Sequence, residues 1–426
     1  ADTVITPPRT EAGVPPRAEA GVLEQEEASG VPTEGRGDGA VVRNGARTGA
    51  GVPRAHDGDG RVAACEDRAS AQAVLRADAA ARAEVDTLEF RCPLSRRYYQ
   101  RWFFRINLES ASRSKDVHQQ RGDATQRDRV WRALRLLCTT QQSVALGRCA
   151  VSPHVTSTIL GEGDVPEEAA SEAVGGAWRC PPGVHLNDSQ QWAVVSSATR
   201  TFTLIVSPPG TGKTMVSRYI LAHWAAHRRA QLLSERAAIL ATSDSHAAVD
   251  NMSEQLLLSA GTALRAGQAA NVRESLHTIL MGQRAEGATE LLRTQVLFTT
   301  AMGCVHESLE GTRFPCVLFD ENGQALEPVT VVALACGAEQ VVLIGDPEQL
   351  PAVVSDLTAS QHGLGVSMLE RLIGAGVHCV TLSVQYRMHA TIAAYPNEVI
   401  YKGLSLIHIS EPTRRTPISY AVFCLK

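Results

Sequence analysis

Six short apolar runs that alternate with helical stretches most constrain the fold of this chain. They are TFTLIV, AAILAT, QVLFTT, PCVLF, QVVLIG and HCVTL, all between residues 186 and 404. The runs are rich in β-branched residues and apolar on both faces, which is typical of parallel strands that helices cover on both sides. We therefore predict a doubly wound α/β domain with a parallel sheet over residues 186–404.

The segment SPPGTGKT, residues 207–214, lies between the first run and a helical stretch. This context is that of a phosphate-binding loop, although Ser207 stands where the usual pattern has its first glycine. A serine is tolerable there if its φ stays negative. Backbone amides of the loop would surround phosphate oxygens, Lys213 would reach the β- and γ-phosphates, and Thr214 would ligate Mg²⁺. The predicted nucleotide-binding residues of this loop are Gly210, Thr211, Gly212, Lys213 and Thr214.

Two further blocks at strand ends carry acidic and amide side chains. Asp320 and Glu321 follow the run PCVLF, at the edge where a doubly wound sheet presents its ligands. Asp320 would hold Mg²⁺, and Glu321 would orient or deprotonate the attacking water. In GDPEQLP, residues 345–351, the amide of Gln349 suits the sensing of a γ-phosphate and of its loss. Either block alone also fits an ordinary turn, but together with GTGKT they predict a nucleotide hydrolase.

Six segments, taken in order, resemble the superfamily 1 helicases of the 5′-to-3′ branch, the group that includes the nonsense-mediated-decay helicase and senataxin. They are LNDSQQWAV, SPPGTGKT, ATSDSHAAVDNM, FTTAMGC, DENGQ and SVQYRMHATIAAYPNEVIYKGL. DENGQ departs at Asn322 from the D-E-A-x-Q of that family. The resemblance covers roughly half of the chain and implies a RecA-like P-loop NTPase domain. It also implies that ATP and Mg²⁺ drive movement along single-stranded RNA or DNA.

The resemblance assigns roles to individual residues. Gln190 would hydrogen-bond the adenine, Tyr386 would stack on it, and Arg387 would contact the γ-phosphate. The implied catalytic set is Lys213, Asp320, Glu321, Gln349 and Arg387. The residues implied to contact the nucleic acid strand are Ser245, His246, Val249, Thr299 and Thr300. Each also has an ordinary reading, for example Tyr386 as a core aromatic, but the joint order and spacing favour the family roles.

Upstream of the domain the sequence is less informative. Residues 1–85 are rich in Ala, Gly, Pro and charged residues, so we expect most of them to be disordered, with one helix in SAQAVLRADAAARAEVDTL. Residues 86–185 are assigned to an accessory, stalk-like segment, in which RRYYQRWFFRINLE forms an amphipathic helix. Its aromatic residues either pack in the core, which we favour, or stack on a nucleic acid strand.

The end of the sequence leads to a prediction about the whole chain. Residues 405–426 do not continue the family pattern and read as translated adapter sequence, so we expect them to be non-native. No second motor domain is recognisable, so we predict a fragment of an intact parent enzyme. Because an arginine finger contributes about 10³ to 10⁵ in rate, the fragment alone should turn over poorly.

Composition and charge narrow the possible kinds of protein and their functions. No apolar run reaches about 18 residues, so no membrane span is expected. Ten cysteines without a C-x-x-C pattern, and no secretory signal, predict a reduced protein in the cytoplasm or nucleus. The net charge of −4 means that a nucleic acid would need a local basic groove. The alternatives are a non-catalytic, nucleotide-switched clamp on nucleic acid and an unrelated phosphate-loop kinase or transporter ATPase, which GDPEQLP and QYRMH disfavour. RNA versus DNA and protein partners stay open.

Overall fold

A computed structural model gives the fold of the chain. The described residues are 60–112, 117–139, 151–162, 180, 183–234, 237–257, 263–282, 290–401 and 405–406. The chain divides into two units, Ala1–Glu66 and Asp67–Lys426, and the second contains the sheet and every predicted site residue. The disorder predicted for residues 1–59 and the non-native tail from 407 on lie outside the described residues, whereas residues 60–85 are helical.

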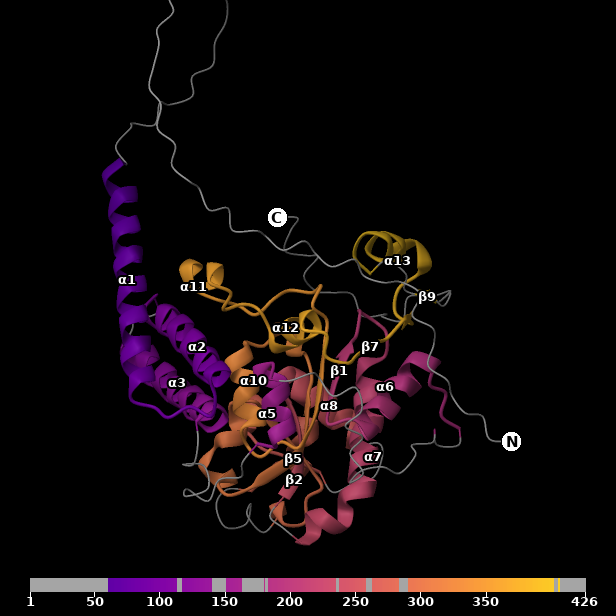
Figure 1. Ribbon diagram of the computed structural model, residues 1–426. Coiled ribbons are helices and arrows are strands. Elements are labelled where there is room, and N and C mark those ends of the chain that lie inside the picture. The colour runs from indigo at the N-terminus through magenta and orange to yellow at the C-terminus, as the bar shows by residue number, and fades with distance from the viewer. Residues whose placement is uncertain are drawn as a thin grey trace, which may run out of the picture. The chain divides into compact units, whose positions relative to one another are not determined.

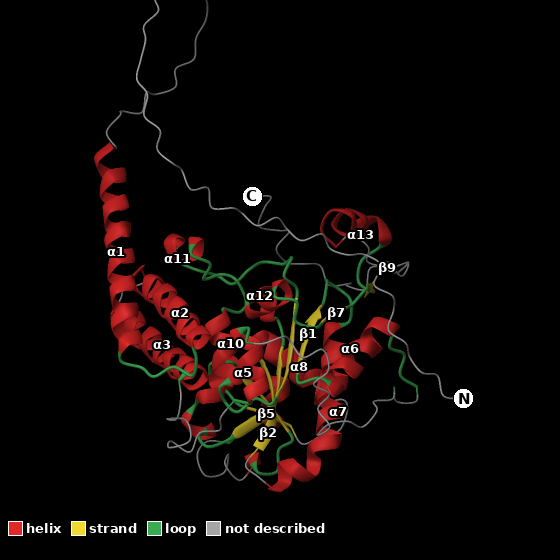
Figure 2. Cartoon of the chain, viewed as in Figure 1, coloured by secondary structure: helices red, strands yellow, loops and turns green. Residues whose placement is uncertain are grey.

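A seven-stranded sheet forms the centre of the second unit (Figure 2). Its strands lie in the order β3-β4-β2-β5-β6-β1-β7, and all neighbouring strands run parallel. The strands are β1 (Phe202–Val206), β2 (Ala237–Ser243), β3 (Ala263–Arg265), β4 (Val296–Thr300), β5 (Arg313–Phe319), β6 (Gln340–Gly345) and β7 (Cys379–Thr381). Each of the six predicted runs forms a strand, which confirms the α/β fold class. Strand β3 was not predicted, because three residues are too few to show a pattern.

The apolar character of these strands on both faces has a direct structural cause. Along β6, Val341 and Leu343 belong to one buried cluster, while Val342 and Ile344 belong to another. Successive side chains of a strand point to opposite faces, so both faces of the sheet are covered. A short parallel pair, β8 (Val384–Gln385) with β9 (Ser405–Leu406), lies outside this sheet.

Helices cover the two faces of the sheet (Figure 1). One face carries α6 (Asp188–Thr199), α7 (Lys213–Ser234) and α8 (His246–Leu257). The other face carries α10 (Glu327–Leu334) and α12 (Met368–Gly374), and the helices α2 (Pro93–Ser112), α3 (Val117–Cys138) and α5 (Pro153–Leu160) extend that side. The remaining α-helices are α1 (Gly60–Asp86), α11 (Leu357–Gln361) and α13 (Ala390–Pro396). Shorter helical turns are Ala269–Asn271, Glu274–Ile279, Gly303–Val305, Glu307–Leu309, Asn322–Gln324 and Asn397–Tyr401.

The aromatic residues of α2 pack inside the protein. Tyr98, Tyr99 and Trp102 are buried, and α2 packs beside α3, which in turn contacts α10. The guanidinium groups of Arg101 and Arg105 lie 5.4 and 5.0 Å from the ring of Trp102. The core interpretation of this helix is therefore confirmed, and these three rings are not available to stack on nucleic acid. Since α2 and α3 belong to the same compact unit as the sheet, the boundary near residue 185 stays a prediction.

A buried acidic residue at the start of α10 joins three helices. Glu327 has no exposed surface, and Arg371 of α12 donates from Nε to both of its carboxylate oxygens, at 3.1 and 2.9 Å. The Tyr98 hydroxyl of α2 donates to the same carboxylate. Burial, and next the charge of Glu327, raise the pKa of Tyr98 well above its usual value. This network fixes the helical layer against the sheet.

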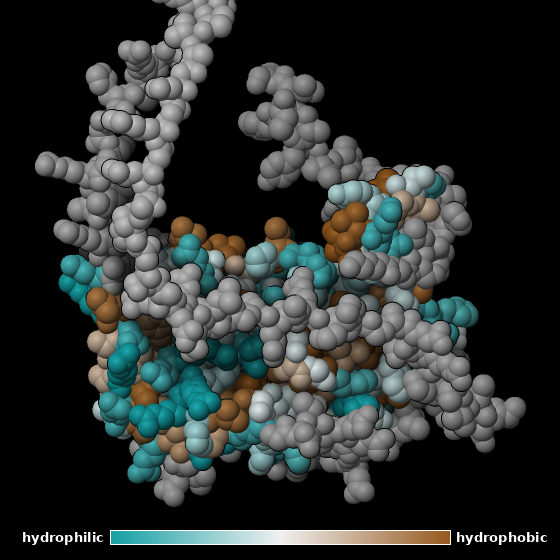
Figure 3. Space-filling view, turned by 45° about the horizontal axis from the view of Figure 1, so that its top comes forward, coloured by the Kyte–Doolittle hydropathy of each residue, from teal (hydrophilic) through white to brown (hydrophobic). Residues whose placement is uncertain are grey.

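The exposed surface is mixed. Among the residues coloured in Figure 3, hydrophilic side chains cover much of the face and hydrophobic ones stand out as separate patches. None of the described helices combines the length and the apolarity of a membrane span.

Candidate nucleotide site and nucleic-acid groove

The two glycines of the phosphate loop are required by the backbone and by its neighbours. Gly210 and Gly212 have φ of +79° and +88°, a region that favours glycine. A Cβ on Gly210 would lie 2.5 Å from Cβ of Arg387, and one on Gly212 would lie 2.5 Å from Nε2 of Gln190. Two predicted nucleotide-binding residues from distant segments therefore lie directly against this loop.

Ser207 occupies the position of the usual first glycine without strain. Its φ is not positive, because Glu321 is the only non-glycine residue with positive φ among the described residues. The Ser207 amide donates to the Gly345 carbonyl at 2.8 Å, and its hydroxyl lies 3.0 Å from that of Thr211. The condition set for this serine is confirmed, and its side chain stabilises the loop from within.

Lys213 lies between the two acidic residues predicted to act in catalysis. Its Nζ hydrogen-bonds Glu321 and lies 3.4 Å from Oδ1 of Asp320. Burial by itself lowers the pKa of Lys213, but the carboxylates of Asp320 and Glu321 outweigh it and raise that pKa. Burial raises the pKa of Asp320, and Lys213 opposes this rise. The φ of +56° at Glu321 marks a strained backbone, which is typical of functional sites.

The donor set at this loop fits a magnesium nucleotide. Among the described residues, no group of three or more His, Cys, Asp or Glu side chains is placed to hold a metal ion by itself. Thr214, in the first turn of α7, and the buried Asp320 offer the hard oxygen ligands that Mg²⁺ prefers beside phosphate oxygens.

Gln349 and Asp346 form a polar pair after β6. The Gln349 side chain donates to Oδ2 of Asp346 at 2.8 Å, and the Tyr401 hydroxyl donates to the same oxygen at 2.7 Å. Burial, and next the bond to Asp346, raise the pKa of Tyr401. The sequence did not point to Tyr401, which the fold brings to Asp346 from 55 residues away.

The residues predicted to bind adenine hold the loop and each other. Gln190 is 4% exposed, its Nε2 donates to the Thr211 carbonyl at 2.9 Å, and its Oε1 accepts from the Asn187 amide at 3.1 Å. The Tyr386 amide donates to the Gly210 carbonyl at 2.8 Å, and its hydroxyl accepts from Asn187 Nδ2 at 2.7 Å. Contact of Gln190 with adenine would therefore use its remaining amide hydrogen or the second lone pair of Oε1.

A groove of about 1030 Å³ lies beside the nucleotide site. The ends of β2, β4 and β5, the helices α2 and α3, and the loop after β6 line it. Three of the five predicted strand-binding residues line this groove, namely Ser245, His246 and Thr300, and so does Glu321. Val249 and Thr299 are not among its lining residues.

Val249 and Thr299 are buried for a clear reason. Val249 has no exposed surface, because α8 packs on β2 and β4 and turns this position toward the core. Thr299 is 2% exposed, and its hydroxyl lies where a Cβ on Gly303 would be 2.3 Å away. The side chains of these two residues are therefore buried, and the strand contacts predicted for their segments stay a prediction.

Two family models and several known proteins match parts of this chain. A family model described as an AAA domain matches residues 185–290 and 266–356, and a second AAA domain model matches residues 364–421. "Regulator of nonsense transcripts 1" of Dictyostelium discoideum is 27% identical over 351 residues, which are 72% of this chain and 26% of that protein. "ATP-dependent helicase upf1" of Schizosaccharomyces pombe is 29% identical over 320 residues, 66% of this chain and 33% of that protein. Residues 185–356 and 364–421 of the chain are therefore similar to AAA domains, and the chain is similar to proteins named as ATP-dependent helicases.

These matches differ in sequence identity and in the share of each protein that they cover. "Probable helicase MAGATAMA 3" of Arabidopsis thaliana is 47% identical, but over 90 residues, 21% of this chain and 11% of that protein. The chain spans about a quarter to a third of the length of the first two relatives. The second AAA match runs past Leu404 to residue 421, so the boundary placed there stays a prediction. A solved structure of an arterivirus helicase in complex with DNA aligns with 54% of this chain and with 47% of the viral chain, at 14% sequence identity. Its TM-score of 0.31 is too low to support any conclusion about this chain.

One residue that departs from the family pattern has a structural role. Asn322 has no exposed surface, its Nδ2 donates to the Thr330 hydroxyl at 2.8 Å, and its Oδ1 accepts from the Leu369 amide at 3.2 Å. The asparagine therefore ties the segment after β5 to α10 and α12. The departure leaves in place Asp320 and Glu321, the two carboxylates that the sequence predicts to act in catalysis.

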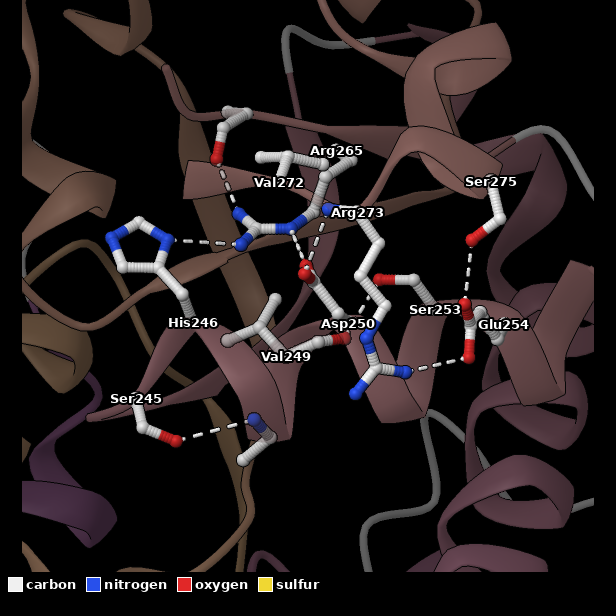
Figure 4. Close-up of polar contacts among 12 residues, drawn as sticks. Ser245, His246, Val249, Asp250, Ser253, Glu254, Arg265, Val272, Arg273 and Ser275 are labelled. Carbon is white, nitrogen blue, oxygen red and sulfur yellow. Dashed lines mark hydrogen bonds and ion pairs between the residues drawn. The ribbon is translucent and has the colours of Figure 1, made fainter. Parts of the chain in front are cut away.

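Sequence reasoning missed two further charged residues, of which Glu109 lines the groove and Arg265 contacts the groove residue His246. Glu109 of α2 accepts from the amides of Ser355 and Asp356, at 2.9 and 2.8 Å, and so holds the loop after β6. Arg265 of β3 is fully buried and pairs with Asp250 of α8 (Figure 4). The glutamate had no local signal, since its partners lie some 246 residues away, and β3 was too short to be predicted.

A second cavity, of about 370 Å³, lies between α3 and the segment that joins β4 to β5. Among its lining residues are Arg129, Cys304 and Cys336, and it contains none of the residues predicted to bind nucleotide or nucleic acid.

Proposed function

We propose that this chain carries the ATP-binding motor unit of an ATP-dependent helicase that couples hydrolysis to movement along single-stranded RNA or DNA. The position of Glu321 carries this proposal. Its carboxylate pairs with Lys213 of the phosphate loop, and the same residue lines the groove together with Ser245 and His246. One residue shared by both sites supports coupling between hydrolysis and strand binding.

The phosphate loop fits a triphosphate through its backbone. Its amides, together with the N-terminus of α7, favour anions. Lys213 would exchange Glu321 for the β- and γ-phosphates, since phosphate competes with carboxylate for the same ammonium group. Gln190 and Tyr386 stand against the same loop and would bind the adenine.

The hydrolytic step would follow from the groups around Lys213. Thr214 and Asp320 would hold Mg²⁺, which when bound neutralises charge on the phosphate oxygens. Glu321, once Lys213 has left it, would orient the attacking water and accept its proton. Gln349, held by Asp346, and Arg387, against Gly210, would contact the γ-phosphate.

The groove would bind the strand mainly by local contacts. Arg127 and His246 supply positive and hydrogen-bonding groups there, while Asp244 and Glu109 also line it. With a net charge of −4, the protein offers no global attraction for a polyanion, so affinity would depend on this local set. Contacts to the backbone would give little sequence preference, and RNA and DNA would differ through the 2′-hydroxyl. Acting on such strands, the protein would work inside the cell, in the cytoplasm or nucleus.

The proposal is tested with Glu321→Gln and a matched control, Glu348→Gln, in the full chain. Glu348 lies exposed in the loop after β6. Binding of a fluorescent ATP analogue and phosphate release are measured with and without uridine or thymidine oligonucleotides. Glu321→Gln should keep nucleotide binding and lose about 10² to 10⁴ in turnover, the usual contribution of a general base, while Glu348→Gln should behave as the parent.

Two results would count against the proposal. If the unmodified chain fails to bind the ATP analogue, the phosphate loop does not bind nucleotide. If Glu321→Gln keeps the turnover of the parent, this residue is not the base, and a nucleotide-switched clamp becomes the better account.

A further inference from the structure

Arg265 is a fully buried cation whose guanidinium group lies against the groove residue His246 (Figure 4). Its Nε donates to Oδ1 of Asp250 at 2.8 Å, and its Nη1 donates to the Ala266 carbonyl at 2.6 Å. Its Nη2 lies 3.1 Å from Nδ1 of His246, which begins α8 and lines the groove. In Figure 4 the other ring nitrogen of His246 points away from Arg265.

The contact with Arg265 decides which nitrogen of His246 carries the proton. A guanidinium group has only donors, so the Nδ1 atom that faces it must offer its lone pair. In a neutral imidazole the single proton is then on Nε2. A protonated ring would instead direct an N–H at Nδ1 toward the N–H of Arg265, and would place two positive charges side by side.

We propose that Arg265 is a positioning residue that fixes His246 as a neutral Nε2–H donor toward the nucleic acid strand. The identity of the ligand rests on the function proposed above, whereas the state of the ring does not. A neutral donor can bond to a phosphate oxygen, a 2′-hydroxyl or a base acceptor, and it displaces no counterion.

The surrounding charges agree with a neutral ring. Burial, and next the charge of Arg265, lower the pKa of His246, and Asp250 opposes this shift only in part. The other charged residues that line the groove are Glu109 from α2, Arg127 from α3, Asp244 after β2 and Glu321 after β5. At about pH 7 the lowered pKa keeps the ring uncharged.

The affinity of the strand should show the signature of a neutral donor. His246→Ala should weaken binding of a uridine oligonucleotide about 2- to 10-fold, as expected for one hydrogen bond. The slope of log affinity against log salt should stay unchanged, whereas the loss of a cation would reduce it by about 0.7. His246→Gln, which can accept from Arg265 and donate to the strand, should restore most of the affinity.

The state of the ring is measured directly by ¹⁵N NMR of histidine side chains in the full chain, without any ligand. His246 should show the Nε2–H tautomer. His227 provides a control of opposite tautomer, since its Nδ1 lies 2.9 Å from the His223 carbonyl and must donate. Arg265→Met, which removes both the donors and the charge, should produce mixed tautomers at His246 and raise its pKa, while burial still lowers that pKa. The matched variant Arg273→Met, whose side chain in the unmodified chain pairs with Glu254 instead, should change neither.

The outcomes separate this inference from the proposed function. A His246 ring in the Nδ1–H or the charged form at about pH 7 would overturn the inference, and so would a reduced salt slope in His246→Ala. The tautomer and the charge state are measured in the unmodified chain, so this result stands even if Arg265→Met fails to fold. Correct tautomers without any strand binding would support the role of Arg265 in setting the ring and would refute the proposed function.

Discussion

Replacement of Arg371 by methionine should destabilise the protein strongly, because it leaves the buried carboxylate of Glu327 without its cationic partner. Arg371 donates from Nε to both oxygens of Glu327, and from Nη2 to the Ile159 carbonyl at 2.9 Å. Glu327 has no exposed surface, and without Arg371 only the Tyr98 hydroxyl would remain as a partner in this network. Methionine keeps much of the apolar stem, so the variant chiefly removes the charge.

The expected cost follows from the burial of Glu327. Removal of one partner from a buried ion pair typically costs about 3 to 5 kcal/mol. The control is Arg273→Met, since Arg273 pairs with Glu254 at the surface, with both side chains more than a third exposed (44% and 35%). Loss of such an exposed pair should cost at most about 1 kcal/mol.

Urea unfolding followed by tryptophan fluorescence measures both variants, since Trp102 and Trp224 are buried on the two sides of the sheet. Circular dichroism must give coincident transitions before free energies are compared. A triple variant, Arg371→Met with Glu327→Leu and Tyr98→Phe, replaces the network by apolar groups and should recover most of the lost stability. Equal losses in Arg371→Met and Arg273→Met, or no recovery in the triple variant, would refute the explanation by a stranded charge.

Three further predictions test the loop, the groove and the pH dependence. Gly210→Ala, with φ of +79° and a Cβ 2.5 Å from that of Arg387, should weaken binding of a fluorescent ATP analogue about 10-fold or more. Gly161→Ala, with φ of +73° and open space, should leave this binding unchanged, and equal affinities in the two variants would contradict the prediction. Glu109→Gln keeps one acceptor for two backbone amides, so it should cost about 1 to 2 kcal/mol and speed hydrogen exchange at the loop after β6; unchanged exchange would show that this carboxylate does not hold the loop. Burial, and next the neighbouring His227, lower the pKa of His223 to about 4 from an unfolded value of about 6.5. Between these two pH values the unfolded chain binds a proton that the folded chain does not, so the contribution of His223 to stability is complete above about pH 6.5 and falls as the pH drops toward about 4. Tm measured across this pH range should therefore depend less on pH in His223→Leu than in the unmodified chain, and an equal dependence in the two proteins would contradict the prediction.

Much of the central architecture was readable from the sequence, because its signals are local. A strand that helices cover on both faces needs a continuous run of apolar residues, and all six such runs became strands. The phosphate loop was equally readable, since its glycines, lysine and threonine are neighbours in the chain. The positive φ of Gly210 and Gly212 explains why those two glycines cannot vary, while the ordinary backbone of Ser207 explains why that position can.

The sequence did not indicate which predicted site residues are buried, or which charged residues hold other residues in place. Val249 and Thr299 carry the spacing of a strand-binding segment, yet α8 and the turn at Gly303 bury them. Arg265 and Glu109 carried no signal, since each gains its role from partners in other elements. Whether an arginine pairs with a buried carboxylate or faces water depends on what packs over it, and periodicity does not report that.

The sequence by itself therefore determined a parallel α/β sheet, a phosphate loop and the two carboxylates at a strand end, because backbone geometry and burial on both faces dictate residue types at neighbouring positions. Only the tertiary structure decided that Glu321 lies at both the phosphate loop and the groove, that Glu327 ties three helices together, and that the buried guanidinium of Arg265 lies against His246. These features join residues that are distant in the chain. They exist only where packing removes water from a charge and leaves a protein group to replace it.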